Sequence, residues 1–230
     1  MIEVYAVKIT KQIEKSVFNR CLAYLHKDKQ VKIMKFYKYE DAQRSLISDI
    51  LIRTLICEKT QISNKDIIFD TNEYGKPFLK KFSNFKFNIS HSCEWIVCAI
   101  YNHSVGIDIE KIAPIDFDVA KQFYSKTEYN ALLSKDPGEA ISFFYDIWTL
   151  KESYIKAAGK GLSIPLDSFS ISINDDTIDL ITENPFKNCF FKQYNIDNNY
   201  KMAVCSSINN FCNEIKYKNI EQLLEGIAVI

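Results

Sequence analysis

The chain has 230 residues, 47% of them hydrophobic and 25% charged, a composition typical of a folded globular protein and unlike that of a disordered one. Its 29 basic and 29 acidic residues cancel, so no overall charge favours binding to nucleic acid or to an anionic membrane. Seven cysteines, an odd number without zinc-type pairs, indicate a reducing compartment, and we expect a cytoplasmic protein.

The first half is predicted to contain a strand, a helical region and three further strands. Residues 1–9 alternate apolar with polar residues, as strands do, and lack the apolar run of a signal peptide. Residues 11–38 have helical spacing, and residues 40–59 carry the apolar stripe of a long amphipathic helix. After turn residues at 72–77, we expect one small antiparallel sheet formed by residues 85–90, 95–101 and 105–110.

The second half is predicted to repeat this arrangement. Residues 119–133 have helical spacing, a break follows at residues 136–138, and a second long helix is expected at 140–158, ended by Gly159. Strands are predicted at residues 169–173, 190–194 and 202–206. We therefore predict an α+β fold with a pseudo-two-fold pair of similar subdomains, residues 1–104 and 105–230, each a long helix on a small antiparallel sheet.

Three carboxylates and one lysine are candidates for catalysis. Asp108 and Glu110 are two residues apart in a predicted strand, so both side chains project from one face. Glu152 and Lys156 are four apart in a predicted helix and also share a face. Such oxygen ligands suit Mg²⁺ and phosphoryl chemistry. The structural alternative is a solvated strand face and a surface salt bridge.

Basic and hydroxyl side chains upstream form a candidate phosphate site. Lysines recur between residues 27 and 38, and Arg44 and Ser45 lie near the start of the long helix, where anions are favoured. Ser90, His91 and Ser92 at a strand end can line a ligand. The alternatives are a solvated basic helix face and a structural histidine.

The segments 105–110 and 148–162 resemble the two signature segments of the 4'-phosphopantetheinyl transferase superfamily. They read VGIDIE and WTLKESYIKAAGKGL. The resemblance extends to residues 40–45, 73–77, 87–92 and 201–205 and so covers nearly the whole chain. It is closest to the surfactin-synthetase-activating type, a single-chain pseudodimer, and it implies the 4'-phosphopantetheinyl transferase fold.

This resemblance implies transfer of 4'-phosphopantetheine from coenzyme A to a serine of an apo carrier protein, with release of 3',5'-ADP. Asp108, Glu110 and Glu152 are implied as magnesium ligands. Glu152 is also implied to help deprotonate the serine, and Lys156 to balance charge on the pyrophosphate. The implied coenzyme A contacts are Lys29, Lys32, Arg44, Ser45, Lys76, Ser90 and His91.

The implied partners are acyl or peptidyl carrier proteins, or carrier domains of nonribosomal peptide or polyketide synthases in antibiotic biosynthesis. Carriers are expected to dock at residues 161–191, where Lys121, Lys126 and Lys160 suit an acidic partner. We expect a monomer that binds neither nucleic acid nor membrane. The alternatives are a non-catalytic protein that binds coenzyme A or a carrier, and a magnesium-dependent nuclease, which zero net charge disfavours.

Overall fold

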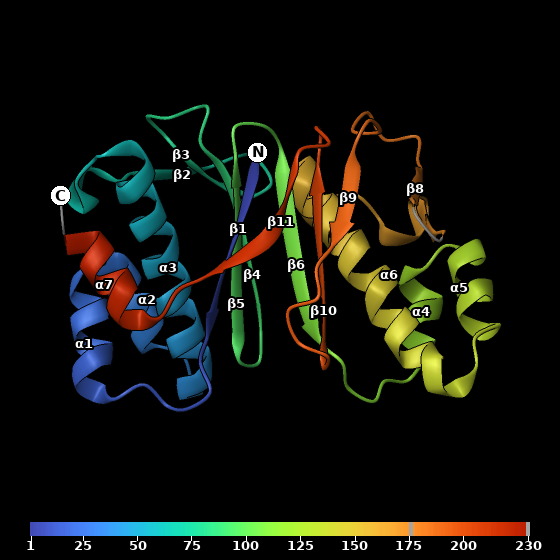
Figure 1. The fold of residues 1–230 in the computed structure, drawn as a ribbon, viewed down its shortest axis with the longest axis horizontal. Helices are drawn as coiled ribbons and strands as arrows, with labels where there is room; N and C mark the ends of the chain where they lie inside the picture. Colours follow the sequence, from blue (N-terminus) through green and yellow to red (C-terminus); the bar gives the residue numbers. More distant parts are fainter. Residues whose placement is uncertain (175–176, 229–230) are drawn as a thin grey trace.

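The structure is a computed structural model and describes residues 1–174 and 177–228 (Figure 1). Two sheets stand face to face in the middle of the molecule, with helices on both outer sides. An apolar core lies between the sheets, formed by side chains such as Val4, Val97, Ile107 and Val204. The predicted α+β class, with a long helix packed on a small sheet in each half, is confirmed.

The first half begins with a strand and three helices and ends with strands. Its elements are β1 (Ile2–Lys8), α1 (Lys15–Ala23), α2 (Lys27–Met34), α3 (Tyr39–Thr60), a 3₁₀ turn (Asn64–Asp66), β2 (Phe69–Thr71), β3 (Pro77–Leu79), β4 (Lys86–Ser92) and β5 (Trp95–Tyr101). The first sheet has the strand order β11-β1-β5-β4, in which β11 (Phe211–Tyr217) comes from the end of the chain. The apolar stripe of α3, including Leu46 and Ile50, is fully buried against this sheet and its neighbouring helices. The predicted long helix is therefore confirmed.

The second half has its own sheet, with the order β6-β10-β9. Its elements are β6 (Val105–Lys111), α4 (Asp118–Phe123), α5 (Lys126–Leu133), α6 (Pro137–Ala158), 3₁₀ turns (Gly161–Ser163 and Leu166–Ser168), β7 (Ser170–Ile173), β8 (Ile178–Ile181), β9 (Phe190–Gln193) and β10 (Tyr200–Ser206). The predicted break at 136–138 is the start of α6, because Asp136 is its N-cap and proline is favoured in the first turn. Gly159 ends α6 in the left-handed conformation, with φ of 75°.

The prediction that residues 85–110 form one sheet is wrong in its third strand. β4 and β5 pair with each other, whereas β6 pairs with β10. The other edge of β6 lies along β4 without a backbone ladder. The physical reason is burial on both faces: Ile107 and Ile109 of β6 pack into the core between the sheets, while Gly106 lies against the backbone of α6.

The last two elements return to the first half of the molecule. β11 (Phe211–Tyr217) pairs in parallel with β1, and α7 (Ile220–Ala228) packs against α3. A division at residues 104 and 105 assigns both elements to the second subdomain, although β11 pairs with β1 and α7 packs on α3, both in the first. In the described part of the chain, no helix is long and apolar enough to span a membrane.

Candidate active site

Asp108 is the most buried of the predicted site residues and lies between β4 and α6. Its side chain comes from β6, and the residue is 2% exposed. Asp108 Oδ1 accepts hydrogen bonds from Lys156 Nζ at 2.5 Å and from Ser90 Oγ at 2.8 Å. Lys156 Nζ also lies 3.2 Å from Ser90 Oγ. The structure therefore brings three predicted site residues from three elements into direct contact.

Glu110 and Glu152 complete the acidic side of the site. Glu110 Oε2 accepts a hydrogen bond from Ser92 Oγ at 2.9 Å. Burial raises the pKa of Glu110 to about 7, and the nearby Asp108 carboxylate adds to the shift. Burial likewise raises the pKa of Glu152, with Asp108 adding to the shift and Lys156 opposing it. Both shifts arise mainly from burial, which disfavours the charged form of a carboxyl group.

The donor set fits a divalent cation bound together with a phosphate. Among residues 1–174 and 177–228, the buried Asp108 Oδ2 has no hydrogen-bond partner, so one carboxylate oxygen is left without compensation. In the same part of the chain, no group of three or more histidine, cysteine, aspartate or glutamate residues is arranged to hold a metal ion. Mg²⁺ does not require such a cage, because it binds through one or two carboxylates, waters and substrate phosphate oxygens.

Arg44 lies beside the turn between β4 and β5, whereas Lys29, Lys32 and Ser45 lie on α2 and α3. Arg44 in α3 donates a hydrogen bond to Cys93 O at 3.2 Å and pairs with Asp41, which places its guanidinium group beside the turn after His91. Lys29 Nζ in α2 lies 2.7 Å from Asp49 Oδ2 of α3. The remaining predicted contacts near these helices are Lys32, which is exposed, and Ser45, which is half-buried.

Lys76 has an unexpected position for a phosphate ligand. Its ammonium group donates to the backbone oxygens of Lys156 at 2.6 Å and Val105 at 3.1 Å. Burial lowers the pKa of Lys76 to about 8. Asn72 donates a further hydrogen bond to Gly159 O at 2.7 Å. The 72–76 turn of the first half thus holds the carboxyl end of α6 in the second half.

Two further side chains of β4 belong to the site: Asn88 is absent from the predicted site residues, and Ser92 is predicted only as a residue that can line a ligand. Asn88 Oδ1 accepts a hydrogen bond from Ile107 N at 2.8 Å, and Ser92 Oγ accepts one from Lys111 N at 3.1 Å. The available signal is the alternation of polar residues at positions 88, 90 and 92, which places all three on one face of β4. That face is the one turned to β6.

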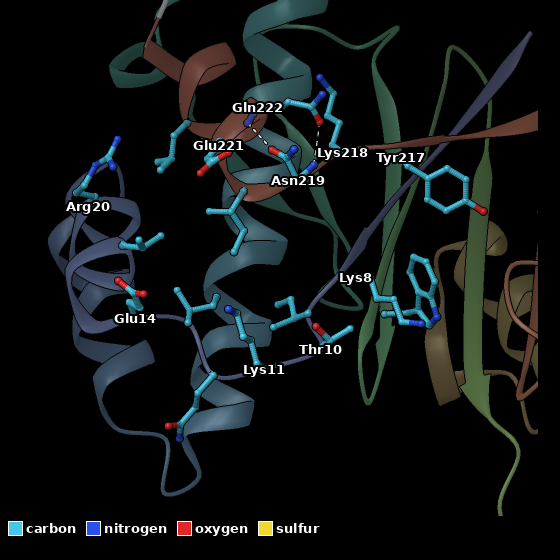
Figure 2. A pocket seen from close by; sticks show the side chains of 17 residues that line it. Lys8, Thr10, Lys11, Glu14, Arg20, Tyr217, Lys218, Asn219, Glu221 and Gln222 are labelled. Atoms are coloured by element: carbon cyan, nitrogen blue, oxygen red, sulfur yellow. Dashed lines mark hydrogen bonds between the residues drawn. The ribbon is translucent and has the colours of Figure 1, made fainter.

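A cavity of about 610 Å³ lies elsewhere, where the end of β1, α1 and α7 meet (Figure 2). Lys8, Lys11, Arg20 and Lys218 contribute positive charge to its wall, and Glu14 and Glu221 oppose it. None of the predicted site residues lines this cavity. The candidate active site is therefore the group of polar side chains between β4, β6 and α6, here called the polar seam, and not this cavity.

Comparison with known proteins identifies the class of enzyme to which this seam belongs. Residues 104–205 match the family model of the 4'-phosphopantetheinyl transferase superfamily, and residues 12–103 match that of the 4'-phosphopantetheinyl transferase N-terminal region. The chain therefore belongs to the 4'-phosphopantetheinyl transferase superfamily. It is a phosphopantetheinyl transferase, which moves the phosphopantetheine group of coenzyme A to a carrier protein.

Two relatives of similar sequence support this assignment, and one solved structure aligns with part of the chain. The chain is 40% identical to the 4'-phosphopantetheinyl transferase Sfp of Bacillus subtilis, over 96% of this chain and 100% of that protein. It is 41% identical to the transferase gsp of Aneurinibacillus migulanus, over 93% of this chain and 89% of that protein. A holo-[acyl-carrier-protein] synthase structure from Thermotoga maritima aligns with a TM-score of 0.39 and 18% identity, over 45% of this chain and 61% of that chain.

Proposed function

We propose that the transfer is magnesium-dependent and that Asp108, Glu110 and Glu152 hold the ion together with pyrophosphate oxygens of coenzyme A. The observation that carries this proposal is the buried Asp108 Oδ2, which has no hydrogen-bond partner in a cluster of carboxylates. Burial raises the pKa of Glu110 and the Asp108 carboxylate adds to the shift, as expected for two carboxyl groups close together in a partly buried site. When bound, Mg²⁺ neutralises charge on the pyrophosphate.

The other steps of the transfer are proposed to depend on side chains of this site. Glu152 accepts the proton of the carrier serine, directly or through a water molecule, as a general base. The serine oxygen attacks the phosphorus that bears pantetheine, the bond to the second phosphate breaks, and 3',5'-ADP leaves. Lys156 stabilises the charge that builds on the leaving phosphate, because its ammonium group is held beside the carboxylates by Asp108.

Coenzyme A is proposed to lie between the carboxylate site and the first half of the chain. Ser90 already contacts Lys156 and Asp108, and Arg44 donates to Cys93 O in the adjoining turn. Burial lowers the pKa of His91, and the nearby Arg44 guanidinium group adds to the shift. Lys29, Lys32 and Ser45 extend this basic region along α2 and α3 toward a 3'-phosphate. The Lys76 ammonium group donates to backbone oxygens, so Lys76 is proposed to contribute to coenzyme A binding indirectly.

The proposed partners are carrier proteins or carrier domains of peptide or polyketide synthases, in the cytoplasm. Lys121 in α4 and Lys126 in α5 are exposed, and Lys160 lies beside the 161–191 segment. These positive charges suit the acidic helix of a carrier. One chain is proposed to be a complete enzyme because its two halves already meet at the site. An obligate trimer in size-exclusion chromatography would contradict the monomer.

The reaction is tested by intact-mass spectrometry of an apo peptidyl carrier protein incubated with this protein, coenzyme A and Mg²⁺. We expect one phosphopantetheine to be added, and we expect a chelator to abolish the addition. Addition that persists after complete chelation would remove magnesium from the proposal. Glu152→Gln tests the base, because lost turnover with retained coenzyme A binding supports it, whereas unchanged turnover excludes Glu152 from the mechanism.

A further inference from the structure

β6, the strand that carries Asp108 and Glu110, is joined to the first half of the molecule by side-chain hydrogen bonds and not by a backbone ladder. β6 pairs with β10 on one edge only. On the other edge, Ile107 N donates to Asn88 Oδ1 and Lys111 N donates to Ser92 Oγ. These two β4 side chains satisfy backbone donors that a neighbouring strand would otherwise satisfy.

Ser92 makes two contacts that together determine where the Glu110 carboxylate lies. Its hydroxyl oxygen accepts from the Lys111 backbone at 3.1 Å, and its proton is donated to Glu110 Oε2 at 2.9 Å. A serine hydroxyl has one donor and two acceptor sites, so both bonds form at once. The acceptor bond holds the hydroxyl to the backbone of β6, and the donor bond then directs the adjacent carboxylate.

The same column of β4 side chains reaches the other carboxylate. Ser90, between Asn88 and Ser92 on that face, donates to Asp108 Oδ1 at 2.8 Å. Asn88 holds the amino-terminal part of β6 through Ile107. The column thus places both carboxylates of β6 relative to α6, although Asn88 and Ser92 leave the orphaned Asp108 Oδ2 untouched.

We propose that Ser92 is a positioning residue that orients Glu110 for a divalent cation, and that Asn88 anchors the same strand. This inference rests on the proposed magnesium site. Hydrogen-bond partners of metal-binding carboxylates commonly change metal affinity by about 10- to 100-fold. Loss of the Ser92 hydroxyl is therefore expected to weaken cation binding while Asp108, Glu152 and Lys156 remain in place.

The test measures Mn²⁺ binding by electron paramagnetic resonance, in the presence of coenzyme A and without a carrier. Ser92→Ala is expected to weaken Mn²⁺ binding about tenfold. Ser92→Thr, which keeps the hydroxyl and suits a strand, is expected to restore it. Ser134→Ala removes an exposed serine hydroxyl that donates to the nearby Ala131 O, outside every proposed binding region, and serves as the matched control with unchanged binding.

Hydrogen exchange supplies a second measurement that does not involve the metal. The Lys111 amide is expected to exchange about tenfold faster in Ser92→Ala, and the Ile107 amide to exchange similarly faster in Asn88→Ala. If Ser92→Ala does not fold, Ser92→Cys replaces it, because a thiol is a much weaker donor of similar size.

The outcomes separate this inference from the metal site itself. Unchanged Mn²⁺ affinity in Ser92→Ala, with binding lost in Asp108→Asn, would overturn the role of Ser92 and leave the proposed site intact. Absence of Mn²⁺ binding by the unmodified protein would overturn the site, and the role of Ser92 with it. Weaker binding in Ser92→Ala that Ser92→Thr does not restore would show a packing defect and would also overturn the inference.

Discussion

Lys156 of α6 and Asp108 of β6 are joined by an ion pair of 2.5 Å between Nζ and Oδ1, at the seam where the two halves of the chain meet. The Asp108 side chain is 3% exposed and the Lys156 side chain 26% exposed, so Asp108 is buried and Lys156 is partly accessible to solvent. This pair links the carboxylates to the lysine that we propose stabilises the leaving phosphate.

Replacement of this lysine tests its role in the transition state. Lys156→Met is expected to lower kcat by about 10²–10³-fold, because a positioned cation acts on charge that develops only during transfer. The measurement is the rate of carrier modification at saturating coenzyme A. Lys81→Met, at an exposed turn position, is the control. A fall of less than tenfold in Lys156→Met would exclude this role.

Close backbone packing at Gly106 predicts a second effect. A Cβ atom at this position would lie 2.1 Å from Ser153 O and 2.3 Å from Ala157 N. Gly106→Ala must therefore push α6 away from β6, at a cost of about 1–3 kcal/mol in unfolding free energy. Displacement of Lys156 and Glu152 by about 1 Å is expected to lower activity about 100-fold.

Gly138→Ala is the matched control for this effect, because a Cβ atom there meets nothing within 4 Å. Urea unfolding and carrier modification should both remain close to the values of the unmodified protein. Equal activity in Gly106→Ala and Gly138→Ala would contradict the packing argument.

The pKa of Glu110 predicts how stability depends on pH when metal is absent. Its pKa is about 7 in the folded protein and 4.5 as a free side chain, so the folded state binds the proton more tightly. This contribution to stability is complete below pH 4.5 and is lost as the pH rises to about 7. The expected loss is about 2–3 kcal/mol.

Urea unfolding in a chelating buffer between pH 4.5 and 8 measures this dependence. Glu110→Gln should remove the Glu110 contribution and be more stable than the unmodified protein at pH 8, while transferring no phosphopantetheine. The same slope with pH in both proteins would show that Glu110 does not titrate in this range.

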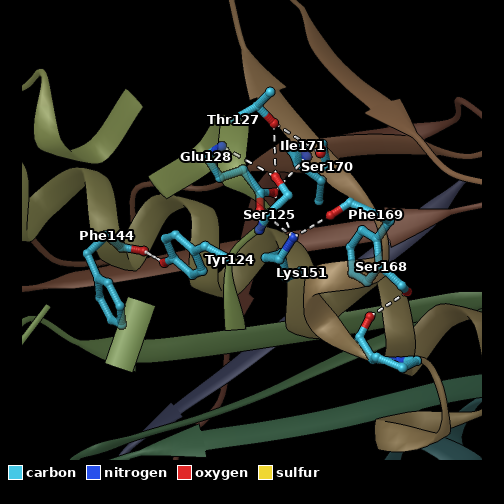
Figure 3. A network of polar contacts seen from close by, with 11 residues as sticks. Tyr124, Ser125, Thr127, Glu128, Phe144, Lys151, Ser168, Phe169, Ser170 and Ile171 are labelled. Carbon is cyan, nitrogen blue, oxygen red and sulfur yellow. Dashed lines mark hydrogen bonds and ion pairs between the residues drawn. The ribbon is translucent and has the colours of Figure 1, made fainter. Parts of the chain in front are cut away.

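Lys151 and Glu128 form a buried ion pair, and loss of one partner is expected to lower stability strongly. Lys151 Nζ lies 2.6 Å from Glu128 Oε2, and the two side chains are 0% and 1% exposed (Figure 3). Lys151 also donates to Phe169 O, and Glu128 accepts from Ile171 N. Lys151→Met leaves the Glu128 charge buried and unpaired, so we expect a loss of about 3–5 kcal/mol in unfolding free energy.

The double variant Lys151→Met with Glu128→Gln separates charge from packing. The neutral glutamine keeps an acceptor for Ile171 N and removes the unpaired charge, so part of the lost stability should return. Urea unfolding of the two variants measures this difference. A double variant less stable than Lys151→Met would contradict the prediction.

The contacts of Lys76 predict a change in stability rather than in direct coenzyme A affinity. Lys76→Met removes hydrogen bonds to Val105 O and Lys156 O and is expected to lower unfolding free energy by about 1–3 kcal/mol. Its KM for coenzyme A should change less than that of Arg44→Ala. Steady-state kinetics with varied coenzyme A make the comparison, and a larger KM change in Lys76→Met would restore Lys76 as a phosphate contact.

Much of the local structure was predictable from the sequence. Apolar residues at helical spacing predicted α3 and α6, and alternation predicted β1 and β6, because side-chain periodicity follows directly from backbone geometry. A continuous apolar run of strand length predicted β5. The spacing of Asp108 with Glu110, and of Glu152 with Lys156, placed each pair on one face for the same reason. The ordered motifs of the family then connected the two pairs to one chemistry.

Only the tertiary structure decided which elements meet. Periodicity shows that one face of a strand is buried but not what it is buried against, so the pairing of β6 with β10 was not predictable from local pattern. The return of β11 and α7 to the first half depends on contacts across about 200 residues of sequence. The positions of Lys76 and Ser92 depend on the same long-range packing, because a side chain's hydrogen-bond partners become defined only when the two halves close on each other.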